Sequence, residues 1–252
     1  MAYYDALQVH LNQRFARDLQ YTVSYSWSHT LDNSNGPFSV TGGNARIFVE
    51  PGGRANLPAN YGNSDQDQRH LLTVSSIYEL PFGRGKRFGR AGNSFLSSLA
   101  GGWQWNNIVT LATGTPFDVF LNGNPSNRPD YLGNAGNGMQ AFASGGLRWI
   151  NFGCFASPPA NRSGVFVRPG RLPRNFFHGP GIQTWDMSLF RTFELNDRIK
   201  FQFRTEGYNI LNIPQFTNPD ANVSDGPSNF GIIRLTRAFS ERQIQVALRI
   251  TF

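Results

Sequence analysis

The residues from 241 to 252, ERQIQVALRITF, alternate between apolar and polar side chains. The apolar positions are Ile244, Val246, Leu248, Ile250 and Phe252, and the positions between them are small or polar. Successive side chains of a β-strand point to opposite faces of the sheet. The alternation therefore predicts a strand with one apolar face and one polar face.

Six other segments alternate in the same way, at residues 6–15, 20–30, 70–80, 102–117, 184–195 and 198–206. With the last segment they make about seven strands of about nine residues or more, longer than the usual mode of about 5–6. Such strands are long enough to cross a bilayer at a tilt. The strands of a soluble β-sandwich also alternate between apolar and polar residues. The lengths of the connections are therefore needed to distinguish a membrane barrel from a soluble sandwich.

The connections alternate between short and long. Short ones follow residues 6–15 (ARD) and 184–195 (ND), and a medium one runs from about residue 81 to 102. The long ones run from about residues 31–69, 116–184 and 212–242 and are rich in Gly, Asn, Pro and Ser. Outer-membrane barrels have short periplasmic turns and long extracellular loops, whereas long structureless loops are uncommon in compact soluble domains. We predict an all-β fold, a partial transmembrane antiparallel β-barrel.

An odd number of antiparallel strands leaves both edge strands pointing the same way. Bacterial single-chain barrels normally have an even number of strands and close on themselves. We therefore expect residues 1–252 to be the C-terminal portion of a larger barrel. We also expect that this segment does not form a stable closed barrel on its own.

The alternation also predicts which side chains face lipid and which face the lumen. The lipid-facing set is Trp103, Trp105, Trp185, Phe201, Phe203, Leu248 and Ile250. The lumen-facing set is Gln104, Asp186, Glu194, Lys200, Gln202, Arg204, Glu206 and Arg249. Arg191 falls in the lipid-facing phase, close to the ND turn, where an arginine costs only about 0–1 kcal/mol. A bulge at Gly207 would change the phase beyond it.

Composition limits the possible partners and chemistry. The net charge is +7, but the arginines are scattered, which favours lumenal and surface charge over binding of nucleic acid. The single cysteine, Cys154, excludes an intramolecular disulfide and a cysteine-based zinc site, and we interpret it as an inert loop residue instead of a nucleophile. No apolar stretch of about 18 residues predicts a transmembrane helix, and residues 1–10 lack signal-peptide character.

The sequence offers no strong catalytic or metal-binding motif. GRGKRFG at residues 83–89 lacks the spacing of a phosphate-binding loop, and the four histidines are scattered along the chain. Asp65 and Asp67 lie in SDQDQRH without the glycine and glutamate of an EF-hand, so we predict a solvated strand entrance there. We expect no enzymatic activity, no cofactor and no metal.

Seven phrases occur in an order that resembles the C-terminal barrel region of TonB-dependent outer-membrane receptors, with the Oar-like type the nearest. They are YDALQVHLNQRF, YSWSHTLDN, DQRHLLTVSSIYELPFGRGKRF, GGWQWNNIVTLATGTPF, GPGIQTWDMSLFRTF, FRTEGYNILNIPQF and RQIQVALRITF. The resemblance covers nearly the whole chain and is weakest around residues 36–62 and 120–175. It implies an outer-membrane barrel of about 22 strands around a plugged lumen.

The resemblance also implies a role and partners. Such receptors take up scarce ligands (siderophores, carbohydrates or similar), driven by the TonB complex through a plug and an N-terminal box that this sequence does not contain. The expected partners are outer-membrane lipid, the N-terminal barrel and plug of the same receptor, and the TonB complex. The alternating strand ending in Phe252 is similar to the signal read by the barrel-assembly machinery; the alternative is an ordinary final strand. The alternative function is a secreted all-β carbohydrate-binding or adhesin-like module without transport.

Overall fold

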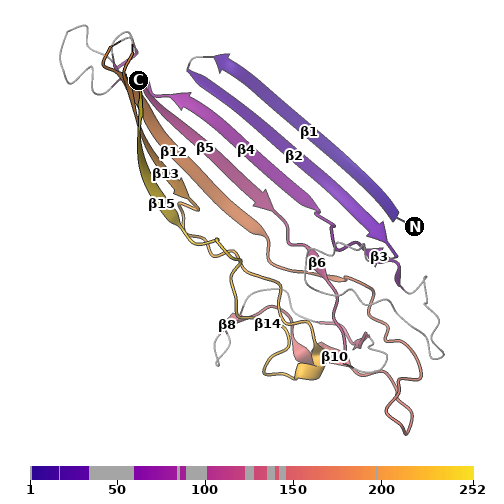
Figure 1. Cartoon of the computed structure of the whole chain (residues 1–252). Helices are drawn as coiled ribbons and strands as arrows, with labels where there is room; N and C mark the ends of the chain where they lie inside the picture. The colour runs from indigo at the N-terminus through magenta and orange to yellow at the C-terminus, as the bar shows by residue number, and fades with distance from the viewer. Residues whose placement is uncertain are drawn as a thin grey trace.

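The computed structural model describes residues 2–16, 18–33, 60–83, 86–88, 101–122, 128–134, 140–141, 146–196 and 198–252. Seven long strands form one antiparallel sheet in the order β1-β2-β4-β5-β12-β13-β15 (Figure 1). Their bounds are β1 (Ala2–Ala16), β2 (Leu19–Asp32), β4 (His70–Glu79), β5 (Trp103–Ala112), β12 (Ile182–Glu194), β13 (Lys200–Tyr208) and β15 (Gln243–Thr251). The seven predicted strands are confirmed.

Short elements occupy the connections. These are β3 (Gly62–Asn63), which pairs with β2, and β6 (Pro116–Phe117), β7 (Asp130–Tyr131), β8 (Gln140–Ala141), β9 (Leu147–Arg148), β10 (Phe155–Ala156), β11 (Phe177–His178) and β14 (Ile232–Ile233). In the described parts of the connections, 3-10 helices span Phe152–Cys154 and Val223–Asp225. Among the described residues, no helix is long and apolar enough to span a membrane.

The connections lie at two ends of the sheet, as the sequence predicts. The turns β1–β2, β4–β5 and β12–β13 lie at one end, which we call the turn end. The connections β2–β4, β5–β12 and β13–β15 lie at the other end, which we call the loop end (Figure 1). This asymmetry is typical of outer-membrane barrels.

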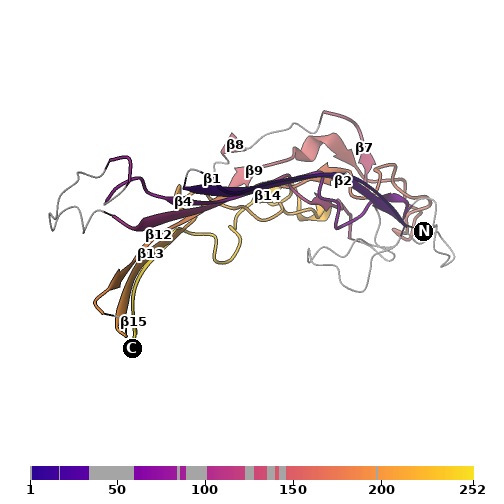
Figure 2. The ribbon, with the colours of Figure 1, turned by 90° about the horizontal axis from the view of Figure 1, so that it is seen from above.

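The sheet is a single curved layer that does not close (Figure 2). Its edges are β1 and β15, and because every neighbouring pair is antiparallel, these two strands run in the same direction. Within the described part of the chain, the outer edges of β1 and β15 pair with no strand. Unpaired backbone groups are costly in hydrocarbon, so both edges require partners in a membrane.

The register fixes the two faces of the sheet. Pairs such as Phe203↔Leu248 and Leu189↔Trp105 place apolar side chains opposite one another across four strands. The pairing of β13 with β15 continues through Gly207↔Ile244 without a shift. No bulge therefore occurs at Gly207, and the phase of the sheet persists to the end of β13. The Cβ of a residue at 207 would come within 2.8 Å of Ile210 Cδ1, at the end of a flexible side chain.

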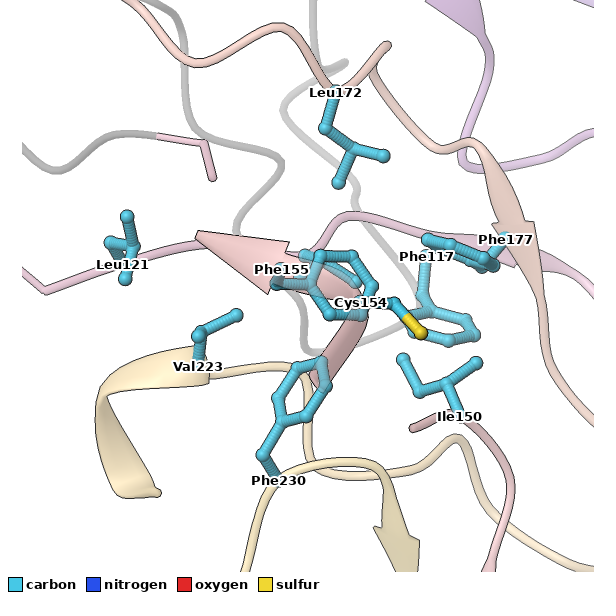
Figure 3. Close-up of a cluster of buried hydrophobic side chains, with 10 residues drawn as sticks. Phe117, Leu121, Ile150, Cys154, Phe155, Leu172, Phe177, Val223 and Phe230 are labelled. Carbon is cyan, nitrogen blue, oxygen red and sulfur yellow. The ribbon is translucent and has the colours of Figure 1, made fainter. Parts of the chain in front are cut away.

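The buried hydrophobic core lies in the connections and not in the sheet. We use the term loop unit for the described residues of the β5–β12 and β13–β15 connections. Its core contains Phe117, Val119, Leu121, Ile150, Cys154, Phe155, Leu172, Phe177, Val223 and Phe230 (Figure 3). Phe155 lies at the centre, with ring centroids 5.1 Å from Phe230 and 5.7 Å from Phe177. The described residues of the β5–β12 and β13–β15 connections thus form a packed structure, although the sequence predicts long structureless loops.

Candidate functional site

The polar face of the sheet carries all eight residues that the sequence predicts to face the lumen. Register places Gln104 opposite Phe190, and Gln202 and Arg249 opposite each other. Asp186, Glu194, Lys200, Arg204 and Glu206 lie in the same phase of β12 and β13. Their shared face follows from the pairing, whereas its contact with a lumen stays a prediction.

Contacts on this face form a ladder of ion pairs and hydrogen bonds. Lys200 Nζ lies 2.6 Å from Glu194 Oε1 across the β12–β13 pair. Arg204 Nη1 lies 3.3 Å from Glu206 Oε1, and Gln202 Nε2 donates to Thr192 Oγ1 at 3.4 Å. Exposed pairs contribute little stability, about 0–1 kcal/mol. The ladder therefore adds little to stability, but it provides a polar surface that can hydrogen-bond to water or to a polar partner.

The opposite face is apolar and exposed. On the two edge strands Leu7, Val9, Val246 and Leu248 are each more than half exposed. Such a broad exposed apolar surface marks contact with a membrane or with another protein. Arg191 lies in this phase, opposite Trp103 and Phe203, as predicted. Its guanidinium carbon lies 4.2 Å from the Phe193 ring centroid, a cation–π contact that compensates the misplaced charge.

The terminal strand presents the predicted assembly signal on its apolar face. Ile244, Val246, Leu248 and Ile250 alternate along β15 and are 52–65% exposed, and Phe252 is 96% exposed. An apolar, unpaired edge is available for strand addition by another protein. Its recognition by the assembly machinery stays a prediction.

A buried ionic network at the loop end joins the sheet to the loop unit. Asp67 is fully buried, accepts a hydrogen bond from Thr30 N at 2.7 Å and pairs with Arg69 at 3.2 Å. The prediction of a solvated strand entrance at Asp65 and Asp67 is therefore wrong. Asp65 pairs with Arg174 from the distant β5–β12 connection, whereas Asp67 is satisfied by the neighbouring Arg69 and by the backbone of Thr30.

Two arginines of the loop unit complete this network. Arg174 contacts the Asp32 carboxylate at the end of β2, and its Nη2 lies 3.6 Å from Asp65 Oδ1. Arg128 Nε lies 3.1 Å from Asp118 Oδ1, and both side chains are about 5% exposed. Buried charges need such partners to remain ionised. The network thus fixes the loop unit against the strand ends.

A pocket of about 930 Å³ lies where the loop unit meets the strand ends. Arg69, Thr113 and Gly181 line it from the residues that adjoin β4, β5 and β12. Aromatic side chains of the loop unit also line it: Tyr131, Trp149, Phe176 and Phe177. Trp149 Nε1 donates to the His178 carbonyl oxygen at 2.7 Å, which fixes the indole.

His178 also lines the pocket, and its environment keeps the ring neutral. Burial lowers the pKa of His178 below its ordinary value, although Asp67 opposes the shift. His178 Nε2 lies 3.7 Å from Asp67 Oδ2, beyond hydrogen-bond distance. In the described part of the chain, no group of three or more His, Cys, Asp or Glu side chains could hold a metal ion.

Sequence reasoning missed the pocket and the ionic network. The partners of Arg174, Asp32 and Asp65, are separated from it by more than a hundred residues, and no local spacing indicates the pairs. Cys154, interpreted as an inert loop residue, is buried in the core of the loop unit, where its Sγ contacts the Asn134 carbonyl oxygen at 2.9 Å. Clusters of phenylalanine within the Gly- and Pro-rich connections were the available signal of a packed core.

Comparison with known protein families decides the class of this sheet. The model of the outer membrane beta barrel domain matches residues 1–245. The chain belongs to this family. It is therefore an outer-membrane protein, and its long strands are those of a membrane β-barrel whose sheet is open in this structure. No curated protein and no solved structure gives a significant match.

Membership of the outer membrane beta barrel family indicates what each face of the sheet contacts. A barrel presents an apolar band to lipid and a polar surface to its interior. The face with Val74, Leu189 and Leu248 fits the lipid side, and the face with Gln202 and Arg204 fits the interior. The family match also removes the soluble secreted module as an interpretation, since this domain resides in the outer membrane.

Proposed function

We propose that this chain is the C-terminal part of a TonB-dependent receptor barrel of the Oar-like type, which takes up a scarce ligand across the outer membrane. The observation that carries the proposal is the open sheet whose edge strands, β1 and β15, run in the same direction. An antiparallel barrel cannot close by pairing these two edges. Additional strands must lie between them, as in a large receptor barrel.

Two further features support a receptor over a simple pore. The ladder from Glu194 to Glu206 offers a polar, hydrogen-bonding surface that a plug can pack against. The loop unit is packed around its own core and encloses a pocket at the end of the barrel expected to face outward. A ligand could therefore bind outside before it enters the barrel.

The proposal assigns partners to each part of the chain. Outer-membrane lipid contacts the apolar face, and the remaining strands of the same receptor pair with β1 and β15. The plug contacts the polar face and links the receptor to the TonB complex. The barrel-assembly machinery captures the terminal strand around Leu248 and Phe252. The proposal includes no enzymatic role, cofactor or nucleic acid.

Two measurements test the proposal. Reading the coding sequence upstream of residue 1 should reveal, in frame, further barrel strands, a plug and a TonB box. Folding residues 1–252 alone into lipid should give neither a heat-modifiable band nor a protease-resistant monomer, because unpaired edges are costly in hydrocarbon. A resistant closed monomer would contradict the receptor and would favour an adhesin-like barrel without transport.

A further inference from the structure

The pocket at the loop end has one wall made of aromatic rings. Phe176 is 45% exposed, and its ring centroid lies 5.5 Å from that of Tyr131. Trp149 is held by its hydrogen bond to the His178 carbonyl oxygen, so its polar edge is satisfied and its ring face remains for apolar contact. A flat ligand with an apolar face would pack on this wall.

The pocket also has a polar wall, formed by Arg69 and His178, with two nitrogen atoms that make no hydrogen bond among the described residues. Arg69 Nε is buried and has no hydrogen-bond partner among the described residues. His178 Nε2 is likewise buried and without a hydrogen bond in the described part of the chain. Native proteins rarely leave buried polar groups unpaired, and each such group calls for an explanation. Hydroxyl groups of a ligand in the pocket would give each nitrogen a partner, since a hydroxyl can accept from Arg69 Nε and can either accept from or donate to His178 Nε2.

The charge of this polar wall is already balanced. The Arg69 guanidinium pairs with Asp67 at 3.2 Å. The His178 ring is neutral at pH 7, because burial lowers its pKa and outweighs the opposing Asp67 carboxylate, while Arg69 and His29 lower it further. The pocket therefore provides donors without a net charge. This favours a neutral ligand with oxygen acceptors over an anion or a cation.

We propose that this pocket binds a neutral saccharide, with sugar rings against Phe176 and Trp149 and sugar hydroxyl groups at Arg69 Nε and His178 Nε2. A sugar ring has an apolar C–H face and a rim of hydroxyl groups that both accept and donate. The volume of about 930 Å³ lies near the upper end of the range of about 300–1,000 Å³ for ligand pockets. This inference rests on the proposed uptake function and names its substrate class.

The test uses the complete receptor, purified in detergent and titrated by calorimetry with a panel of neutral oligosaccharides. The panel is maltohexaose, cellohexaose, xylohexaose and hexa-N-acetylchitohexaose, which do not partition into micelles. Phe176→Leu removes a ring from the wall at a partly exposed position. Phe88→Leu is the matched control, since Phe88 is 63% exposed near the β4–β5 turn, far from the pocket in the fold. Arg69→Lys keeps a charge beside Asp67 and removes the Nε–H donor.

The expected result is saturable binding of at least one oligosaccharide. Phe176→Leu and Arg69→Lys should each weaken it on the order of tenfold, and Phe88→Leu should leave it unchanged. Heat modifiability checks that each variant is folded. Absence of binding across the panel, or equal binding by Phe176→Leu and wild type, would overturn the saccharide site.

The test of saccharide binding in the pocket can fail independently of the test of TonB-dependent transport. Saccharide binding without TonB-dependent uptake by cells would retain the pocket and refute the proposed import. Uptake that depends on TonB, together with no binding in the panel, would retain the import and overturn the saccharide assignment. Both measurements therefore use the same protein but different readouts.

Discussion

An arginine placed at the centre of the apolar face should strongly destabilise the folded barrel in the membrane. Val74 lies in the middle of β4, between Val23 of β2 and Val109 of β5. Ser75 is the next residue and points to the polar face, where its cross-strand neighbours are Thr22 and Ile108. Val74→Arg and Ser75→Arg therefore introduce the same side chain at the same depth on opposite faces.

The magnitude follows from depth and face. An arginine on the lipid face costs about 2–4 kcal/mol at the bilayer midplane and about 0–1 kcal/mol near an interface. Val74→Arg should thus lower the ratio of folded to unfolded barrel by about 30-fold to 1,000-fold. Ser75→Arg faces the interior and should change it little. Phe201→Arg tests depth, because Phe201 is one residue pair from the β12–β13 turn, where the same charge can reach the headgroups.

The assay is folding of the complete barrel into lipid vesicles, with the folded fraction measured by heat modifiability across a guanidinium titration. The predicted order of stability is Ser75→Arg close to wild type, Phe201→Arg slightly lower, and Val74→Arg much lower. Equal destabilisation by Val74→Arg and Ser75→Arg would refute the assignment of the two faces. Equal effects of Val74→Arg and Phe201→Arg would refute the assigned depth.

Three other predictions concern the terminal strand and the loop unit. Deleting Phe252 should reduce the surface-exposed fraction of the receptor, whereas Phe252→Tyr should not; wild-type surface levels for the deletion would leave Phe252 only a packing role. Arg174→Met leaves Asp32 and Asp65 without their buried cation, a loss of about 3–5 kcal/mol that should speed protease cleavage within the loop unit; unchanged cleavage would contradict the network. Because the pKa of His178 is lowered in the folded state, the loop unit should lose stability as the pH falls below about 6.5. Protease cleavage of the loop unit should therefore be faster at pH 5.5 than at pH 7.5. The difference between the two pH values should be much smaller in His178→Gln.

The strands and their faces could be predicted from the sequence because period-2 alternation is a local signal. In β13 and β15, apolar and polar residues alternate along the chain, so the sequence already indicates the face on which each side chain lies. The pairing Phe203↔Leu248 confirms this assignment. The uninterrupted register at Gly207 was not predictable in this way. A glycine in a strand signals either a bulge or a close approach, and only the register of β13 with β15 shows that there is no bulge.

The loop unit could not be predicted, because its order arises from contacts between distant segments. Phe117, Phe155 and Phe230 meet in one core although more than thirty residues separate each from the next. The sequence around Asp67 predicts a solvated loop carboxylate. In the structure this carboxylate is buried, where it pairs with Arg69 and accepts a hydrogen bond from the backbone of Thr30. Composition rich in Gly, Asn and Pro marks irregular backbone, and it does not show whether that backbone is packed.

The most direct test of the central claim is a cysteine scan of β15 in the complete barrel reconstituted in lipid. Single cysteines replace successive residues from Ile244 to Thr251 in a Cys154→Ala background, each with a spin label whose relaxation by oxygen and by a water-soluble nickel complex is measured. We expect a period of two, with oxygen more effective at Ile244, Val246, Leu248 and Ile250 and nickel more effective at the positions between them. Equal access of nickel to both sets, without alternation, would contradict a lipid-facing apolar side and a wet interior.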